Sequence, residues 1–329
     1  MCSNRGPLPP PMNAFLQNLA LAAPMFVLVL AGWLLAHTPR FNDVVADALN
    51  KFVFAVALPA LLFPMMADLS RLPAVDARLL AAYFGGCLVV FAIGRLLGWT
   101  AFRLDGVAQS VFALGGVFSN TVLLGVPIAK LALGDAALPA VALVIVFNAL
   151  VLWTLVTVSV EWARHGQMSV RGFATTAKSV VTNPIVASIV GGFLFGLTGL
   201  TLPTLVAEPL RLAGQAAAPM ALVVLGMGLA QYAVRDGWPV GLAVTVLKLV
   251  VHPLVVWGLA LALGLPPIET QAVVLLASLA VGVNVYLMSN EFKALQGPVA
   301  ASLVLSTLLG AITTPLVLTL IGAAALPAR

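Results

Sequence analysis

Charged residues are scarce in this chain. Asp, Glu, Lys and Arg make up 8% of its 329 residues, whereas 62% are hydrophobic. Soluble domains carry about 25% charged residues, because much of their surface must interact with water. A soluble fold of this length could not hide so much apolar surface. The composition therefore excludes that class and indicates a protein that lies in a bilayer.

Carboxylates are missing from the middle of the long apolar segments. The 11 Asp and Glu residues all lie near segment ends or in the connections. Hard cations prefer oxygen ligands, so this absence disfavours sodium coupling, although backbone carbonyls at a helix break could still bind the ion.

Motifs for ATP hydrolysis and for enzyme chemistry are also missing. The chain has no GxxxxGK[ST] loop, no HExxH sequence and no Ser/His/Asp arrangement. Its two cysteines, Cys2 and Cys87, have the spacing of neither a metal site nor a disulfide framework. We therefore expect neither an ATP-driven pump nor an enzyme, and no metal or cofactor.

The basic residues do not indicate nucleic-acid binding. The net charge is +5, but the Lys and Arg residues form no run and are not interleaved with aromatic residues. The alternating apolar and polar strands of an outer-membrane barrel are not found either. Helical spans remain as the expected structure.

The chain does contain a series of apolar segments, each near the roughly 20 residues that one membrane-spanning helix needs. We predict an all-α polytopic membrane protein with ten spans. Residues 1–14 and 324–329 form polar tails, and residues 163–178 form the longest connection. The predicted spans are Phe15–His37, Asn50–Ala67, Leu79–Trp99, Val107–Leu133, Pro139–Trp162, Ser179–Leu197, Leu212–Val234, Pro239–Leu263, Ile268–Asn290 and Pro298–Ala323.

The two halves of the chain, residues 15–162 and 179–323, share an order of features. At offsets of 160 to 162 residues, Ala23-Pro24 matches Asn183-Pro184, Lys51 matches Arg211, Pro59 matches Pro219, and Gln109 matches Gln271. A repeat of five spans is odd, so the second copy must enter the membrane in the opposite orientation. Inverted repeats of this kind are typical of secondary transporters.

The Lys/Arg bias predicts the orientation. Nine basic residues flank the spans on the side of the 163–178 connection, and six flank them on the side of the termini. By the positive-inside rule, the connection lies in the cytoplasm and both termini lie outside.

The fourth predicted span contains residue types that a lipid-facing helix avoids. They are Gly115, Gly116, Ser119, Asn120, Thr121 and Pro127. Glycine loosens a helix and proline lacks the N–H that the helix needs, so we expect a break near the membrane midplane. The half-helix ends at a break can hold an anion, and the three polar side chains can bind the same group. The alternative is close packing of helices through small residues.

The ninth predicted span has a corresponding cluster. Gly282 and Asn284 lie where a break symmetric with the one at Ser119 would fall, and Tyr286 adds a polar group nearby. The break rests on Gly and Asn alone, because this span has no proline. The alternative is a buried Asn that hydrogen-bonds to a neighbouring helix.

The eighth predicted span contains Lys248 and His252, which share one face of a helix. A charged residue at the bilayer centre costs at least about 2.5–3.5 kcal/mol, so Lys248 should face a cavity or have a partner. The pair is a candidate counter-charge for an anion, or a proton-handling element. The alternative is a structural lysine bonded to the carbonyls of a broken helix.

At these residues the chain resembles the auxin efflux carrier family, and within it the bacterial malonate-transporter-like members. The resemblance covers residues 13–320. It rests on four motifs, which are Phe118–Pro127, Asn183-Pro184, Lys248–Pro253 and Val281–Leu287.

The resemblance implies two inverted five-helix repeats, as in bile acid–sodium symporters, with a scaffold domain and a transport domain. Broken helices four and nine would cross, and the substrate anion would bind beside the crossover. Ser119 and Asn120 fall at the first crossover position, and Asn284 falls near the second. Plant members have a proline at both crossovers, whereas the ninth span here has none.

These features together predict a secondary transporter of a small organic anion, such as malonate, that works by elevator-like alternating access in a bacterial inner membrane. Protons or the membrane potential would drive it, and a homodimer remains open. The candidate substrate-binding residues are Ser119, Asn120, Thr121, Lys248, His252, Asn284 and Tyr286. Two alternatives are a sodium-coupled bile-acid-type symporter and a membrane sensor that binds a ligand without moving it.

Overall fold

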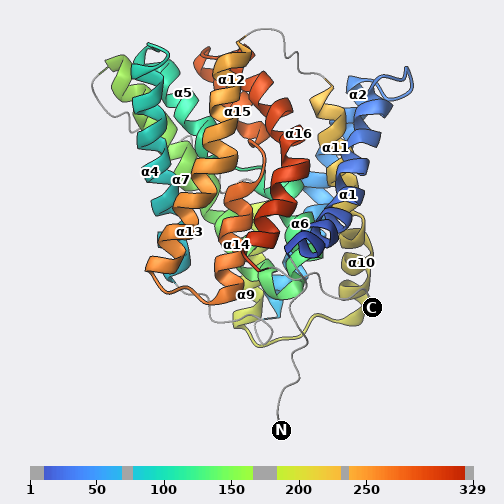
Figure 1. The fold of residues 1–329 in the computed structure, drawn as a ribbon. Coiled ribbons are helices and arrows are strands. Elements are labelled where there is room, and N and C mark those ends of the chain that lie inside the picture. The colour runs from blue at the N-terminus through green and yellow to red at the C-terminus, as the bar shows by residue number, and fades with distance from the viewer. Residues whose placement is uncertain (1–10, 69–76, 166–183, 231–236, 323–329) are drawn as a thin grey trace.

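The protein is helical throughout the part that the structure describes. The computed structural model describes residues 11–68, 77–165, 184–230 and 237–322, and its regular elements are α-helices, π-helical turns and one 3-10 turn. Seven of the described helical segments are long and apolar enough to cross a membrane (Figure 1). The chain is therefore a multi-pass membrane protein, as its composition predicts.

Five helices run without interruption, and their bounds agree with five of the predicted spans to within a few residues. They are α1 (Pro11–Ala36), α4 (Ala77–Thr100), α7 (Leu138–His165), α9 (Pro184–Leu197) and α16 (Gln296–Leu320). Helix α1 begins inside the predicted polar tail. The rest of that tail, most of the predicted 163–178 connection, residues 179–183 and the C-terminal tail lie outside the described residues.

In three other spans a π-helical turn lies just before a proline, and the helix continues through it. These turns are η1 (Val53–Ala57) before Pro59, η3 (Thr121–Gly125) before Pro127, and η5 (Leu247–Val251) before Pro253. Proline has no N–H and its ring clashes with the carbonyl four residues earlier. In a π-helical turn the hydrogen bonds reach five residues back, as from the Leu58 N–H to the Val53 carbonyl. The wider turn relieves the clash, so the helix continues.

The second and seventh spans begin earlier than predicted. The second joins α2 (Asp43–Phe52), η1 and α3 (Leu58–Ala67), and the seventh joins α10 (Thr204–Gln215) and α11 (Ala217–Leu229). Their first turns are amphipathic, so a search for apolar runs misses them. Asn42 caps α2 by accepting a hydrogen bond from the Val45 N–H. The predicted end of the seventh span, Val234, lies outside the described residues.

Two spans are broken. One consists of α5 (Gly106–Val117), η3 and α6 (Val126–Leu133), and the other of α14 (Pro267–Ser278) and α15 (Val283–Phe292). In Figure 1, α5 and α15 occupy the upper half of the molecule, whereas α6 and α14 occupy the lower half. The two broken helices therefore meet in the middle of the bundle.

Element positions recur along the chain at a nearly constant interval. The first residues of α4 (Ala77) and α12 (Trp238–Val246) are 161 residues apart, and so are the first residues of α5 (Gly106) and α14 (Pro267). Helix α12 continues through η5 into α13 (His252–Ala262), which completes the eighth span. This interval agrees with the offsets of 160 to 162 found in the sequence.

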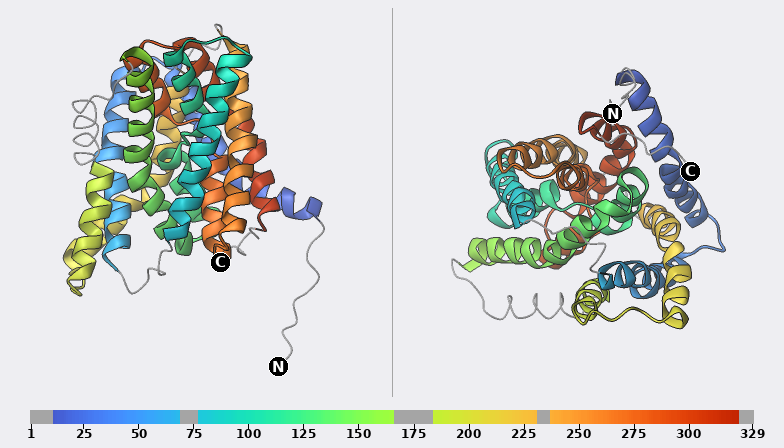
Figure 2. Two further views of the ribbon diagram at one scale, coloured as in Figure 1. Left: turned by 90° about the vertical axis from the view of Figure 1, so that its left-hand side faces the viewer. Right: turned by 90° about the horizontal axis from the view of Figure 1, so that it is seen from below.

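The helices pack around the two breaks. Helix α1 lies along α11 and α16, α3 lies along α9 and α10, and α4 lies along α5 and α13. Seen from below in Figure 2 (right), α1 lies at one rim of the bundle and α4 at the opposite rim. All residues from Ser110 to Thr121 are buried, so the first break lies in the core.

Helices α1 and α11 touch through their backbones. A Cβ atom added to Gly32 would lie 2.0 Å from the Val223 carbonyl oxygen, and one added to Gly226 would lie 1.8 Å from the Val29 carbonyl oxygen. Each helix thus presents a glycine where the partner's backbone passes. Small residues of this kind allow close helix packing in membranes.

We expect Gly226→Ala to destabilise the protein by about 1–3 kcal/mol, because the added methyl group forces α1 and α11 apart. The measurement is the melting temperature of the purified protein in detergent. Gly228→Ala is the matched control in the same helix, since a Cβ atom there meets nothing within 4 Å. Equal melting temperatures for the two variants would contradict the proposed backbone contact.

Candidate functional site

The two broken helices are joined where they cross. Ser119 and Val281 form an isolated antiparallel bridge. The Asn120 N–H donates to the Ala280 carbonyl at 2.9 Å, and the Gly282 N–H donates to the Phe118 carbonyl at 2.8 Å. Unpaired backbone groups in a hydrocarbon interior cost several kcal/mol each, so two breaks that pair with each other remove a large penalty.

Gly282 makes this close approach sterically feasible. A Cβ atom on Gly282 would lie 2.9 Å from both the Ser119 carbonyl oxygen and the Phe118 ring. Only a residue without a side chain fits there unless the backbone at Phe118 and Ser119 shifts. The ninth span thus breaks without a proline, because Gly282 and the extended Leu279 (φ −69°, ψ 160°) end the helical geometry.

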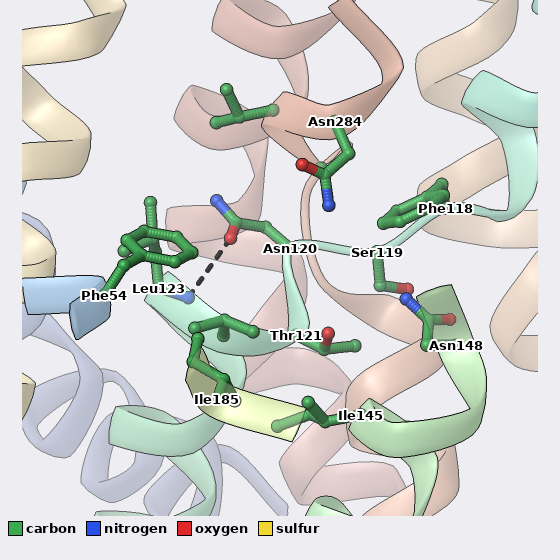
Figure 3. Close-up of a pocket in the computed structure, with 13 residues that line it drawn as sticks. Phe54, Phe118, Ser119, Asn120, Thr121, Leu123, Ile145, Asn148, Ile185 and Asn284 are labelled. Atoms are coloured by element: carbon green, nitrogen blue, oxygen red, sulfur yellow. Dashed lines mark hydrogen bonds between the residues drawn. The ribbon is translucent and has the colours of Figure 1, made fainter. Parts of the chain in front are cut away.

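Asn120 begins the second half of the first broken helix. Its Oδ1 atom accepts a hydrogen bond from the Leu123 N–H at 3.3 Å, so the side chain caps η3 (Figure 3). The cap fixes the orientation of the amide group and leaves Nδ2 as the free end. Asn120 Nδ2 is buried and has no hydrogen-bond partner. Buried donors normally have an acceptor, so this amide group can donate to a bound ligand.

A cavity of about 100 Å³ lies beside the crossover. One buried water needs roughly 10–15 Å³, so the space can hold a small ligand or several waters. The lining residues are Phe54, Phe118, Ser119, Asn120, Thr121, Val122, Leu123, Ile145, Asn148, Ile185, Gly282, Val283 and Asn284 (Figure 3). None of these described lining residues is ionisable.

Two half-helices begin at this cavity, η3 at Thr121 and α15 at Val283. The first N–H groups of a helix have no partner within the helix, and the helix dipole places a partial positive charge there. The two helix ends therefore contribute positive potential to the cavity without a charged side chain. It also has apolar walls from Phe54, Ile145 and Ile185.

A second cavity, of about 280 Å³, adjoins the first. It shares Phe54, Leu123, Val283 and Asn284 with the first cavity and extends to Asp47 and Asn50 on α2. In Figure 1, α2 lies near the upper end of the bundle. The crossover cavity thus lies next to a second cavity that extends toward that end.

Lys248 lies behind the crossover rather than in the cavity. It is fully buried, and its Nζ atom donates to the Ala277 carbonyl near the C-terminal end of α14. Nζ also lies 3.2 Å from His252 Nδ1. The last carbonyls of a helix lack partners and carry a partial negative charge, so Lys248 satisfies one of them. This arrangement matches the structural alternative, a lysine bonded to a broken helix.

Polar side chains of α4 complete this buried region. His252 Nε2 lies 3.4 Å from Cys87 Sγ, and the Tyr83 and His252 rings are 5.9 Å apart. The Tyr83 hydroxyl donates to Ser119 Oγ at 3.4 Å. The Ser119 oxygen thus accepts the hydrogen bond from Tyr83. The Ser119 hydroxyl hydrogen is left to donate to a group in the cavity.

The structure brings together four of the seven candidate substrate-binding residues, Ser119, Asn120, Thr121 and Asn284. Lys248, His252 and Tyr286 do not line the cavity.

Three of the four expected helix-breaking residues lie elsewhere than at the break. Gly115 and Gly116 are helical residues of α5, and Pro127 lies in the first turn of α6, which η3 leads into. A Cβ atom on Gly115 would lie 2.6 Å from Val244 in α12, and one on Gly116 would lie 2.3 Å from Leu247 in η5, so these glycines let α5 pack closely against the eighth span. The break itself falls at residues 118–120, because Asn120 caps a new helix there.

Asn148 is the polar lining residue that the sequence prediction missed. It is 3% exposed, lies in the middle of α7, and its Oδ1 atom has no partner. The available signal was an asparagine in the centre of an apolar span, where a polar side chain usually has a functional role. Phe54, Ile145 and Ile185 gave no such signal, because apolar residues fill every span.

Comparison with known proteins agrees with this geometry. A family model described as a membrane transport protein matches residues 19–318. The chain is also 30% identical over 315 residues to a protein of Rhizobium meliloti (strain 1021) named "Putative malonate transporter". That alignment covers 94% of this chain and 97% of the relative. Both breaks and the cavity lie inside the matched region.

We expect Gly282→Ala to destabilise the protein, because its methyl group would press on the Ser119 carbonyl and strain both hydrogen bonds of the bridge. The expected loss is about 1–3 kcal/mol, measured as a lower melting temperature in detergent. Gly258→Ala on α13 is the control, since a Cβ atom there meets nothing within 4 Å. A Gly282→Ala protein as stable as the control would contradict the close crossing.

Proposed function

The chain belongs to the auxin efflux carrier family of membrane transport proteins, and from this membership we propose that it is a secondary transporter of a small organic carboxylate such as malonate. The family makes it a transporter and not an enzyme. The substrate class is our inference from the crossover cavity and from the name of the Rhizobium meliloti relative.

The buried, unpartnered Nδ2 of Asn120 is the observation that carries this proposal. Ser119 can donate a second hydrogen bond, and the N-termini of η3 and α15 add partial positive charge. A carboxylate accepts hydrogen bonds and donates none, so it complements a set of donors. Thr121 and Asn284 line the same space and complete the proposed site. Tyr286, which does not line it, is left out.

The proposed architecture is ten helices in two inverted five-helix repeats. The 161-residue interval between corresponding helices and the antiparallel bridge between the two breaks support it. By resemblance to the family, the third and fourth helices of each repeat would form a transport domain that moves against a scaffold. Substrate bound at the crossover would then move with that domain, in an elevator-like cycle.

The proposed setting is a bacterial inner membrane, with the 163–178 connection in the cytoplasm and both termini outside. A homodimer remains compatible with the proposal. A ligand sensor is the less favoured alternative, since family membership points to transport. Protons or the membrane potential are the favoured driving forces, because the described residues that line the crossover cavity include no carboxylate to hold sodium.

Asn120→Asp tests the binding site with an almost isosteric change. The aspartate can still cap η3 through one oxygen, but it replaces the free donor with a second, negatively charged acceptor. We expect the KM for malonate uptake into proteoliposomes to rise at least tenfold, because a hydrogen bond to a charged group contributes about 1.5–3 kcal/mol.

Asn18→Ala is the control for this experiment. Asn18 is also a buried asparagine, but it bonds to Thr319 between α1 and α16 and does not line the cavity. Its loss should leave KM unchanged. Unchanged KM for Asn120→Asp would remove Asn120 from the site.

Replacing sodium by choline on both sides of the proteoliposome membrane should leave malonate uptake unchanged. The described lining residues offer no carboxylate for a sodium ion, and the positive helix ends would repel a cation. Initial rates at a fixed membrane potential are the measurement. Loss of uptake in choline would instead support the sodium-coupled symporter alternative.

A further inference from the structure

The lining of the crossover cavity comes from two groups of spans. Residues 118–123 and 282–284 belong to the two broken spans, which carry the donors of the proposed site. The other described lining residues come from neighbouring spans, and they are Phe54 from η1, Ile145 and Asn148 from α7, and Ile185 from α9 (Figure 3). Among these neighbours, Asn148 alone is polar.

Asn148 carries a buried amide group without a hydrogen-bond partner. The residue is 3% exposed, and its Oδ1 atom bonds to no described residue. A buried polar group in this condition is unfavourable. Asn18, a buried asparagine of α1, donates to Thr319 and so has a partner. Because Asn148 lines the cavity, a bound ligand can supply the missing partner, and a half turn of the amide group presents Nδ2 to a carboxylate.

In the proposed transport cycle, Asn148 does not move with the substrate. The fourth and ninth spans belong to the moving domain, so Asn120 and Asn284 travel with the bound carboxylate. Helix α7 is the fifth span, which belongs to the scaffold, so Asn148 stays in place. A substrate that crosses the membrane must therefore leave Asn148 behind. The contact can exist in only one of the two end states.

The position of the second cavity indicates which end state this is. That cavity adjoins the crossover cavity and extends to Asp47 and Asn50. Both residues lie near the start of α2 at Asp43, directly after the connection between the first two spans. In the proposed orientation this connection lies in the cytoplasm, like the 163–178 connection. Asn148 thus lines the cavity in the state whose cavities extend toward the cytoplasm.

Helix α16 offers no equivalent free amide for the opposite state. It is the fifth span of the second repeat, and an inverted repeat gives it the place of α7 when the molecule is viewed from the other side. The buried hydroxyls of Ser306 and Thr307 both donate to the Leu303 carbonyl. Ser306 also accepts a hydrogen bond from the Val281 N–H at 3.0 Å. These groups already have partners, whereas Asn148 Oδ1 has none.

We propose that Asn148 is a scaffold contact of the substrate that forms only while the site faces the cytoplasm, so that the carrier binds its carboxylate more tightly on that side. This inference rests on the function proposed above. The groups of the broken spans hold the substrate in both end states, and Asn148 adds one hydrogen bond in one of them. The two faces of the membrane therefore differ in affinity, although the moving part of the site is the same.

The test is the KM for malonate, measured separately from each face. Inverted membrane vesicles that contain the protein take up malonate from the cytoplasmic face, and right-side-out vesicles take it up from the outer face. Both are assayed at zero membrane potential and equal pH. Asn148→Leu removes the amide group with little change in volume. We expect its KM from the cytoplasmic face to rise about tenfold, the effect of losing one hydrogen bond to a charged group, and its KM from the outer face to stay nearly unchanged.

Two further variants complete the experiment. Asn148→Ala repeats the test with a smaller side chain and should show the same one-sided rise. Thr154→Val is the matched control, because Thr154 lies on the same helix, its buried Oγ1 atom also has no described partner, and it does not line the cavity. Its KM should stay unchanged from both faces. The melting temperature of the empty Asn148→Leu protein in detergent should not fall, since the amide group has no hydrogen bond to lose.

The outcomes separate this inference from the function on which it rests. Equal rises of KM from both faces would overturn it, because Asn148 would then act in both end states. An unchanged KM from the cytoplasmic face would also overturn it, because Asn148 would not contact the substrate there. Wild-type vesicles that take up no malonate from either face would instead refute the proposed carboxylate transport, and this inference with it.

Discussion

Backbone hydrogen bonding in a medium without water is the constraint on which this structure depends. A helix that stops inside a membrane exposes N–H and C=O groups that lipid cannot satisfy. Here each broken helix supplies the partner for the other, through the Asn120–Ala280 and Phe118–Gly282 hydrogen bonds. Asn120 caps one half-helix and Lys248 binds a carbonyl at the end of another. A polar site can exist in the core because these groups remove most of the penalty.

The same constraint explains why Pro127, Gly115 and Gly116 did not mark the first break. A proline removes one hydrogen bond and introduces one clash, and a π-helical turn accommodates both, as η3 does before Pro127. Glycines such as Gly115 stay helical and allow neighbouring helices to approach. The break is located instead where a side chain can cap a new helix and where another backbone is close enough to pair. Asn120 provides the first condition and Gly282 the second.

Much of the fold could be predicted from the sequence, because apolar length alone determines where a helix can cross a bilayer. The start of α2 at Asp43 and of α10 at Thr204 could not, since their first turns carry polar residues on one face. Within the site, Ser119, Asn120 and Asn284 were recognisable because polar residues are rare in spans. The position of Lys248 relative to the cavity was not, because helical spacing does not say which neighbour a side chain meets. Asn148 was recognisable as a polar residue in the centre of an apolar span. Its place in the site became clear only from the cavity that it lines.

The division between donors at the cavity and charge behind it has a physical advantage for a carrier. A lysine in direct contact with a carboxylate would hold it through a short ion pair, and release would require separating two charges in a low-dielectric medium. Helix N-termini and an amide donor attract an anion more weakly, and Lys248 adds a longer-range field without a contact. A carrier must bind its substrate on one side of the membrane and release it on the other, so moderate affinity favours turnover. The neutral lining of the cavity and the buried lysine are therefore two parts of one arrangement, which attracts an anion without a direct ion pair that would slow its release.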